Sequence, residues 1–474
     1  MASLHYHNGK NALTLRWTRG SMPLCQCKMN GKMTSLESLY ELYLQHPQVT
    51  TDSRDCPKGS IFFALKGESF DGNLFAARAL EQGCAAAVVD NPEVAVDDRF
   101  VLVSNVLETL QQLAAMHRRR WGKTVIQITG TNGKTTTKEL IAAVLSQAHH
   151  VLYTQGNLNN HIGVPRTLLR LTDEHDLAVV ETGANHPGEI RFLCSLVHAD
   201  YGLITNVGRA HLLGFGSFEG VKRTKGELYD DLSQRGGQIF LNALDDDLRQ
   251  MAEERGLMVG RQAIPYVEAR VESCSPFLHI QWRQDVDEPW HSVSTQLIGA
   301  YNIANLRAAI TVGLHFGVSP KQIDQALADY HPTNNRSEFR QTEHNRLVVD
   351  AYNANPSSME AALTAFDFVE QPSKMVILGD MRELGAESRQ EHLRVLHQLH
   401  RMHLEQVWLV GSEFAAALQD FLGENADAQQ TTTYLTFENE QQVEQHLAAH
   451  PLEGHTILVK GSNGTGLFRL PALL

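Results

Sequence analysis

Residues 125–137 (VIQITGTNGKTTT) join a short apolar strand to the start of a helix through a turn that contains two glycines. Gly130 and Gly133 let the backbone curl so that successive N–H groups point inward, and the helix N-terminus adds partial positive charge. Lys134 can reach the terminal phosphates of a nucleotide, and Thr135 can offer its hydroxyl to a magnesium ion. The segment therefore predicts a binding site for nucleotide phosphates.

The spacing of this turn departs from the standard phosphate loop, which has glycine where this chain has Ile128. It matches the shorter pattern Gly-x-x-Gly-Lys-Thr. The alternative is a structural turn that happens to contain glycine and lysine, but the strand before it and the helix after it favour phosphate binding. The residues expected at the nucleotide are Gly130, Thr131, Asn132, Gly133, Lys134, Thr135 and Thr136.

Length and composition exclude several classes of protein. A chain of 474 residues is too long for one ordinary core and predicts two to four domains. With 42% apolar and 20% charged residues it has the composition of a soluble globular protein, and a net charge of −13 argues against a general nucleic-acid or anionic-membrane surface. No apolar run approaches the length of about 18 residues that spans a bilayer, so we expect no membrane insertion. Six scattered cysteines fit free thiols in a reducing cytoplasm.

Apolar strands alternate with helical patterns in three blocks, which predicts three α/β domains. The expected boundaries are 33–103 for a small N-terminal domain, 104–331 for a central domain that contains the phosphate loop, and 332–474 for a doubly wound, Rossmann-like C-terminal domain. Residues 1–32 carry five lysines and arginines but no acidic residue, and we expect them to form a disordered or dispensable extension.

Buried strands in the central block predict a mostly parallel sheet with helices on both faces. Ligands of such sheets lie beyond the carboxyl ends of the strands. Lys134, Glu181 and His211 each follow the end of a predicted strand, so we expect them on one edge of the sheet. The strands are predicted at 125–129, 177–180, 201–205 and 238–241.

Four further segments accompany the phosphate loop in a fixed order. They are 156–165 (GNLNNHIGVP), 181–190 (ETGANHPGEI), 205–212 (TNVGRAHL) and 352–359 (YNANPSSM). Together these segments resemble the Mur ligases of peptidoglycan synthesis, and the resemblance runs from about residue 51 to residue 466. It implies a three-domain α/β fold and an ATP-dependent, amide-forming ligase.

Within this family the asparagine-rich segment 156–165 and the segment 352–359 are most similar to the branch that joins D-alanyl-D-alanine to UDP-N-acetylmuramoyl-tripeptide. Such a ligase transfers the γ-phosphoryl group of ATP to a carboxylate, and an amine then attacks the acyl phosphate. The resemblance thus implies ATP and the two substrates as partners, and a cytoplasmic enzyme of cell-wall synthesis, which we expect to be a monomer.

The resemblance also implies a metal site with two magnesium ions. Glu181 supplies a hard oxygen ligand, which suits magnesium. His211 is implied only by the motif around it, because imidazole suits softer metals. Lys225 matches a lysine that the family carries as a carbamate, which would turn a cation into an anionic ligand; Lys222 lies close by in the sequence and is an alternative. The expected ligands are Thr135, Glu181, His211 and carbamylated Lys225, and the expected catalytic residues are Lys134, His211 and Lys225.

The remaining site residues are likewise implied by the resemblance. Asn305 is expected at adenine, where its amide can donate and accept, and Arg336 and Asp350 at the phosphates and ribose once the domains close over ATP. Taken alone, many of these side chains are equally typical of ordinary turns. The substrate residues are Ser53, Arg54, Lys66 and Gly67 for the UDP end, Asn157, Asn159, Asn160 and His186 for the muramoyl peptide, and Asn353 and Asn355 for the dipeptide.

Three other functions remain open. A sibling ligase that adds another amino acid and a folylpolyglutamate synthase belong to the same class of enzyme. A P-loop kinase or regulatory nucleotide-binding module belongs to a different class, in which ATP turnover would not depend on an amine acceptor. The sequence leaves open whether the tripeptide ends in lysine or diaminopimelate, and no residue stands out as a general base.

Overall fold

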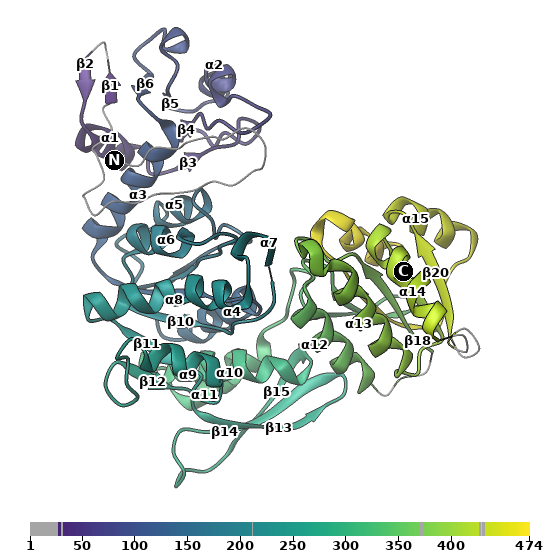
Figure 1. Cartoon of the computed structure of the whole chain (residues 1–474). Helices are drawn as coiled ribbons and strands as arrows, with labels where there is room; N and C mark the ends of the chain where they lie inside the picture. The colour runs from purple at the N-terminus through teal and green to yellow at the C-terminus, as the bar shows by residue number, and fades with distance from the viewer. Residues whose placement is uncertain are drawn as a thin grey trace. The chain divides into compact units, whose positions relative to one another are not determined.

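The computed structural model describes residues 27–29, 32–210, 212–369, 371, 373–425, 428 and 432–474. The described residues form two compact units (Figure 1). One contains the residues up to Gln127 with Leu152–Ala184 and Gly188–Asp200, and the other contains Ile128–Val151, Asn185–Pro187 and the chain from Tyr201 onward. The domain boundaries expected after residues 103 and 331 stay predictions.

The N-terminal sheet lies in the first unit and has the strand order β2-β1-β6-β5-β4-β3. Its strands β3 to β6 are parallel, while β1 runs antiparallel to both β2 and β6. The strands are β1 (Cys27–Met29), β2 (Lys32–Thr34), β3 (Val49–Thr50), β4 (Ile61–Phe63), β5 (Ala86–Val89) and β6 (Phe100–Val103), and the helices are α1 (Leu36–Gln45), α2 (Ala76–Glu81) and α3 (Val106–Trp121).

The pairing of β1 with β6 corrects the expectation for residues 1–32. Cys27 and Lys28 are in register with Val103 and Leu102, so this part of the extension belongs to the sheet. The lack of acidic residues misled the prediction, because backbone hydrogen bonds hold the short strand β1 between β2 and β6 and need no particular charge pattern. Residues 1–26, 30 and 31 lie outside the described residues.

The central sheet has the strand order β12-β11-β10-β7-β9-β8, and β10, β11 and β12 are parallel. The four strands predicted for this block are confirmed to within one residue at each end. The strands are β7 (Thr124–Thr129), β8 (Val151–Tyr153), β9 (Leu177–Glu181), β10 (Tyr201–Ile204), β11 (Gln238–Leu241) and β12 (Ala263–Pro265), and the helices are α4 (Lys134–Leu145), α5 (Gly163–Leu168), α6 (Glu189–Val197), α7 (Leu212–Phe215), α8 (Phe218–Arg235) and α9 (Asp246–Glu253).

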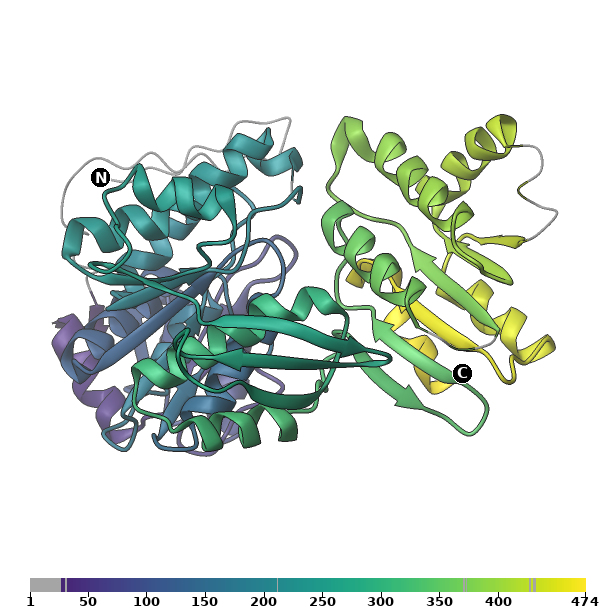
Figure 2. The same cartoon turned by 90° about the horizontal axis from the view of Figure 1, so that it is seen from below.

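A three-stranded antiparallel sheet follows in the second unit, and the sequence analysis missed it. It consists of β13 (Glu268–Cys274), β14 (Phe277–Arg283) and β15 (His291–Ile298), which Figure 2 shows side by side in green. The sequence signal for a strand was the alternation of apolar and polar residues along β14. Its apolar residues Leu278, Ile280 and Trp282 are buried in the structure. Two helices, α10 (Ile303–His315) and α11 (Pro320–Asp329), lead from this sheet toward the C-terminal sheet.

The C-terminal sheet has the order β16-β17-β21-β18-β19-β20, with β16 antiparallel and the other strands parallel. Apolar side chains of α12 to α14 cover one face and those of α15 and the last residues cover the other, as the doubly wound prediction requires. The strands are β16 (Glu338–Gln341), β17 (Arg346–Asp350), β18 (Lys374–Gly379), β19 (Gln406–Val410), β20 (Thr433–Phe437) and β21 (Thr456–Lys460), and the helices are α12 (Pro356–Asp367), α13 (Ser388–His400), α14 (Ser412–Glu424) and α15 (Glu440–Ala449).

No helix among the residues described is long and apolar enough to cross a lipid bilayer.

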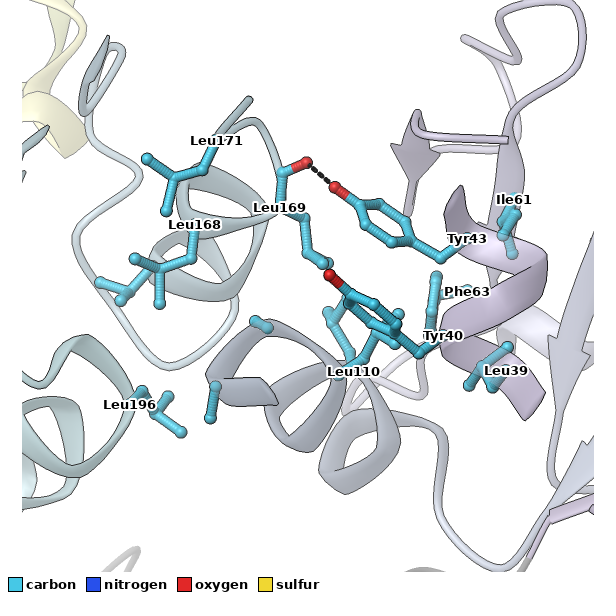
Figure 3. Close-up of a cluster of buried hydrophobic side chains, with 14 of the residues drawn as sticks. Leu39, Tyr40, Tyr43, Ile61, Phe63, Leu110, Leu168, Leu169, Leu171 and Leu196 are labelled. Atoms are coloured by element: carbon cyan, nitrogen blue, oxygen red, sulfur yellow. Dashed lines mark hydrogen bonds between the residues drawn. The ribbon is translucent and has the colours of Figure 1, made fainter. Parts of the chain in front are cut away.

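The core of the first unit includes two tyrosines with hydrogen-bonded hydroxyls (Figure 3). Tyr43 donates to the Leu169 carbonyl over 2.6 Å. The buried ring of His117 lies 3.0 Å from the Tyr40 hydroxyl through Nδ1 and 2.8 Å from the Leu171 carbonyl through Nε2. Nε2 faces a carbonyl and therefore carries a proton; with burial disfavouring the charged ring, Nδ1 is assigned as the acceptor from Tyr40. The ring is therefore neutral in the fold.

Burial lowers the pKa of His117, because desolvation disfavours the charged ring. As the pH falls below the ordinary histidine value of about 6.5, the unfolded chain takes up a proton that the folded chain does not. His117 therefore makes the fold less stable in acid, by up to about 1.4 kcal/mol per pH unit. Thermal unfolding should show a smaller acid-induced loss of Tm in His117→Gln than in the parent, with the exposed His403→Gln as control. Equal losses in all three proteins would contradict this role.

Candidate functional site

The turn between β7 and α4 has the backbone of a phosphate loop. Gly130 and Gly133 have φ angles of 144° and 75°, which L side chains rarely adopt. A Cβ atom at Gly130 would collide with Oγ1 of Thr205, and one at Gly133 would lie 2.7 Å from Oδ1 of Asn305. Both glycines are thus required by conformation and by space, while phosphate binding by this turn stays a prediction.

Lys134 opens α4 and folds back over this loop. Its Nζ donates to the carbonyl of Gly130 over 2.8 Å and to that of Thr131 over 3.0 Å. These contacts hold the ammonium group at the mouth of the loop, beside the N-terminus of a helix that favours anions. Thr135, the next residue, is buried.

The segment after β10 holds the loop from the other side. Asn206 accepts from the backbone N–H of Asn132 over 3.0 Å and donates from Nδ2 to the Asn132 carbonyl, also over 3.0 Å. Thr205 donates to the same carbonyl over 2.6 Å. The beginning of segment 205–212 therefore fixes the shape of the phosphate loop, a role that the sequence analysis did not assign. His211 of that segment lies outside the described residues.

Asn305 lies directly against the loop, but both functions of its amide are in use. Its Oδ1 accepts from the Thr137 hydroxyl over 2.9 Å, and its Nδ2 donates to Oδ1 of Asn302 over 2.8 Å. Each group has a second hydrogen-bonding position, because an amide oxygen accepts twice and an amide nitrogen donates twice. The contact of Asn305 with adenine stays a prediction.

Asn355 reaches the phosphate loop from the C-terminal part of the chain. It caps α12 by accepting from the Ser358 N–H over 2.9 Å, and its Nδ2 donates to Oδ1 of Asn132 over 2.8 Å. Asn353, in contrast, accepts from the next backbone N–H. These contacts give Asn355 and Asn353 structural roles, and their expected contact with the dipeptide stays a prediction.

Asp350 and Arg336 lie in the same region of the second unit. The Asp350 carboxylate accepts from Nζ of Lys460 over 2.6 Å and from the Ser337 N–H over 3.3 Å. Lys460 is 1% exposed, so this is a buried ion pair. The Arg336 guanidinium lies 3.7 Å from the centre of the Tyr352 ring, and its buried Nε has no hydrogen-bond partner in the described structure. The described part of the protein therefore offers no hydrogen-bond acceptor to Nε of Arg336.

Lys460 is a site residue that the sequence analysis missed. Its signal was the glycine-rich stretch 460–466 (KGSNGTG), which directly follows the buried strand β21. A lysine at the end of a fully buried strand needs a partner, because an isolated charge is costly to bury.

The two candidate lysines of α8 differ sharply in environment. Lys225 is 2% exposed, and its Nζ lies 5.4 Å from the centre of the Phe215 ring. Lys222 forms a 2.6 Å ion pair with Asp247, as is usual for a lysine near the surface. Of the two lysines only Lys225 is held in the interior, and its carbamylation stays a prediction.

The first unit contains the asparagine-rich turn and Glu181. Asn159 donates from Nδ2 to Oε1 of Glu181 over 2.7 Å, and this carboxylate is 1% exposed. The side chain of Asn160 accepts from two backbone N–H groups at the start of α5, whereas Asn157 is exposed. Glu181 is thus a buried carboxylate and not an exposed acid at a strand end. Asn160 has a structural role.

The residues expected at the UDP end lie in the loops of the N-terminal sheet. Arg54 donates twice to Asp52, over 2.9 and 2.8 Å, and this hydrogen bonding lowers the pKa of Asp52 to about 2. Lys66 forms a 2.9 Å ion pair with Asp90. Gly67 donates its N–H to the Phe70 carbonyl in a tight turn. None of these contacts assigns these residues, Ser53 or His186 to a substrate, so that role stays a prediction.

Within the described ranges, no three His, Cys, Asp or Glu side chains come close enough together to hold a metal ion. His211 is outside those ranges, and two of the other expected ligands, Thr135 and Lys225, are of other residue types. The magnesium site therefore stays a prediction.

Three family models match the chain in sequence order. They are described as the Mur ligase family catalytic domain, matching residues 47–118, the Mur ligase middle domain, matching 128–313, and the Mur ligase glutamate ligase domain, matching 335–463.

Curated relatives match over most of their length. A relative from Escherichia coli K12 is 37% identical over 88% of this chain and 91% of its own, and one from Bacillus subtilis 168 is 35% identical over 75% of this chain and 77% of its own. Both are named UDP-N-acetylmuramoyl-tripeptide–D-alanyl-D-alanine ligase.

Solved structures agree with the fold. A MurF crystal structure from Acinetobacter baumannii superposes with a TM-score of 0.76 and 32% identity, covering 90% of this chain and 92% of the other. MurF from Thermotoga maritima in complex with ADP has a TM-score of 0.73 at 24% identity, covering 91% and 97%, and supports the fold alone. The predicted three-domain α/β architecture is confirmed. The chain belongs to the Mur ligase family.

Proposed function

We propose that this chain is an ATP-dependent ligase that joins D-alanyl-D-alanine to UDP-N-acetylmuramoyl-tripeptide. The products are ADP, phosphate and UDP-N-acetylmuramoyl-pentapeptide. The main observation behind the proposal is the phosphate loop, in which Nζ of Lys134 donates to the carbonyls of Gly130 and Thr131. The relatives that match this chain over most of their length are named as this ligase.

The reaction has two steps. An oxygen of the tripeptide's terminal carboxylate attacks the γ-phosphorus of ATP, the bond to the bridging oxygen breaks, and ADP leaves. The dipeptide amine then attacks the carbonyl carbon of the acyl phosphate, and phosphate departs with the carboxylate oxygen. The dipeptide's ammonium group loses one proton to become a nucleophilic amine and a second as the amide forms, and the amide nitrogen keeps one N–H.

Positive groups placed around the γ-phosphate explain the need for this loop, because the first step brings anions together. Lys134 and the N-terminus of α4 stabilise the phosphates on the side of the phosphate loop. Arg336 is proposed to donate to them from the other side, since its buried Nε is without an acceptor in the described protein. The loop N–H groups and Lys134 thus orient ATP, and Arg336 adds a second positive charge beside its phosphates.

Magnesium is proposed as a further partner, and when bound it would screen the charges of the phosphates and the carboxylate. The oxygen donors of Thr135 and Glu181 suit this ion. The buried position of Lys225 is consistent with a carbamate, because a surface lysine would remain a cation. The proposed ligands are Thr135, Glu181, His211 and Lys225.

The substrate residues, the cytoplasmic location and the monomeric state expected from the resemblance are kept as proposals. The UDP end is assigned to the loops of the N-terminal sheet, the muramoyl peptide to the asparagine turn, and the dipeptide to residues near α12.

Phosphate release tests the proposal. It is measured with ATP and both substrates, and again with each substrate left out. Release that requires both, with formation of the pentapeptide, is expected. Release that ignores the dipeptide would instead favour a sibling ligase or a plain nucleotidase.

Lys134→Ala should lower the ligation rate about 10³-fold, because the transition state loses a charge beside the γ-phosphate. Circular dichroism should report an unchanged fold. The exposed Lys321→Ala on α11 is the matched control and should keep the parent rate. Near-normal turnover of Lys134→Ala would remove the assignment of the phosphate loop.

Lys225→Ala should lose ligation and regain part of it with a short carboxylic acid such as acetate, which replaces the anionic oxygen of the carbamate. Mass spectrometry under native conditions should find one added carbon dioxide on the parent. Lys222→Ala should behave as the parent, because its ion pair with Asp247 lies near the surface. An unmodified Lys225 together with no rescue would exclude the carbamate.

A further inference from the structure

The chain segment 330–338 connects α11 with β16 and contains Arg336. We call this segment the connector. The proposed mechanism needs Arg336 to reach the phosphates, yet it does not explain what holds the connector in place. Contacts at the two ends of the connector supply an answer.

The first end of the connector is bound to the helix of the phosphate loop. Glu139, in the second turn of α4, accepts from the Tyr330 hydroxyl over 2.7 Å through Oε2. It also accepts from Nδ2 of Asn334, at 3.0 Å from each carboxylate oxygen. The carboxylate is only 22% exposed, and its Oε1 also lies 3.4 Å from Nζ of the fully buried Lys138, so these charge-assisted bonds are partly shielded from water.

The other end of the connector is bound to the C-terminal sheet. Ser337 donates its N–H to Asp350 over 3.3 Å, and its hydroxyl lies 2.6 Å from that of Tyr301. Asp350 is in turn fixed by the buried Lys460. Arg336 therefore lies between two anchored residues.

The backbone between these anchors is strained. Asn335 and Ser337, on either side of Arg336, have φ angles of 55° and 49°. Residues other than glycine rarely adopt this backbone conformation, and serine is not among the residues that tolerate it best. Such a conformation persists only where surrounding contacts enforce it, and the two anchors provide those contacts.

We propose that Glu139 is a positioning residue for the ligase reaction. Its carboxylate ties the connector to the helix that begins at Lys134, so that occupation of the phosphate loop restrains the connector and holds Arg336 in place. This inference rests on the proposed function. It assigns Glu139 no contact with the substrate, because the residue lies more than one helical turn beyond the loop.

Hydrogen exchange of the connector tests the proposal without any turnover. In the parent, saturating ADP with magnesium should slow exchange of the amides in segment 330–338. In Glu139→Ala this protection should be lost while the Kd for ADP, measured by calorimetry, stays within about threefold of the parent. Glu139→Gln keeps an acceptor oxygen and should regain part of the protection.

Kinetics give the second readout. Glu139→Ala should lower kcat about tenfold at saturating ATP with little change in the KM for ATP, since orientation and not nucleotide affinity is lost. Gln322→Ala is the matched control, because the contacts that it removes, with the Gln147 carbonyl and with Ser319 at the beginning of α11, do not involve the connector. It should resemble the parent in both readouts.

Persistent protection in Glu139→Ala would overturn the proposal, and so would a loss of ADP affinity that parallels the loss of kcat. If Glu139→Ala fails to fold, the same measurements on Tyr330→Phe test the proposal. This variant removes the hydrogen bond from Tyr330 to Glu139 and leaves the carboxylate and its contact with Asn334 in place. If the parent forms no pentapeptide, the proposed function fails, and the exchange experiment still decides whether Glu139 restrains the connector.

Discussion

The close approach of segment 205–206 to the turn at Gly130 is the constraint on which the second unit depends. The Thr205 hydroxyl and the Asn206 amide bind the backbone of Asn132, and no side chain fits at Gly130 beside them. Asn132 in turn binds Asn355 at the start of α12. The shape of the phosphate loop is thus set by residues distant in sequence, and the same contacts link it to the chain that follows β17.

Some buried charged groups among the described residues are paired with partners that also fix the course of the backbone. Lys460 pairs with Asp350, which holds Ser337. In the first unit the buried guanidinium of Arg118 donates to the carbonyls of Val197 and His198 at the end of α6. Since an unpaired buried charge is costly, each pair favours one arrangement of the chain over its competitors. Precise positions of loop residues follow from this pairing.

The sequence predicted the strands that carry the phosphate loop and most elements of the C-terminal sheet, because buried parallel strands have a strong apolar signal. It missed β13 to β15, whose half-exposed strands alternate polar and apolar residues, and it assigned β1 to a disordered extension. The short strand β1 depends on backbone pairing with β6, which lies far away in the sequence, and local sequence patterns do not record such pairing.

Within the site, the turn conformation expected at Gly130 and Gly133 agrees with the structure, because the residue type itself imposes it, whereas the contact of Lys134 with a phosphate stays a prediction. It was less complete for asparagines. Asn160 and Asn355 cap helices, and Asn305 is bonded to Thr137 and Asn302. An amide serves equally well in a turn, a cap or a ligand contact, so sequence alone does not distinguish these roles. Lys460 and Glu139 were missed because their partners lie far away in the chain.

Transfer of oxygen from the tripeptide to phosphate tests the central claim most directly. The terminal carboxylate of UDP-N-acetylmuramoyl-tripeptide is labelled with oxygen-18, and the released phosphate is analysed by mass spectrometry after ligation to D-alanyl-D-alanine. An acyl phosphate requires one labelled oxygen in the phosphate for each pentapeptide formed. Unlabelled phosphate would contradict phosphoryl transfer to the carboxylate, and with it the role assigned to the loop around Lys134.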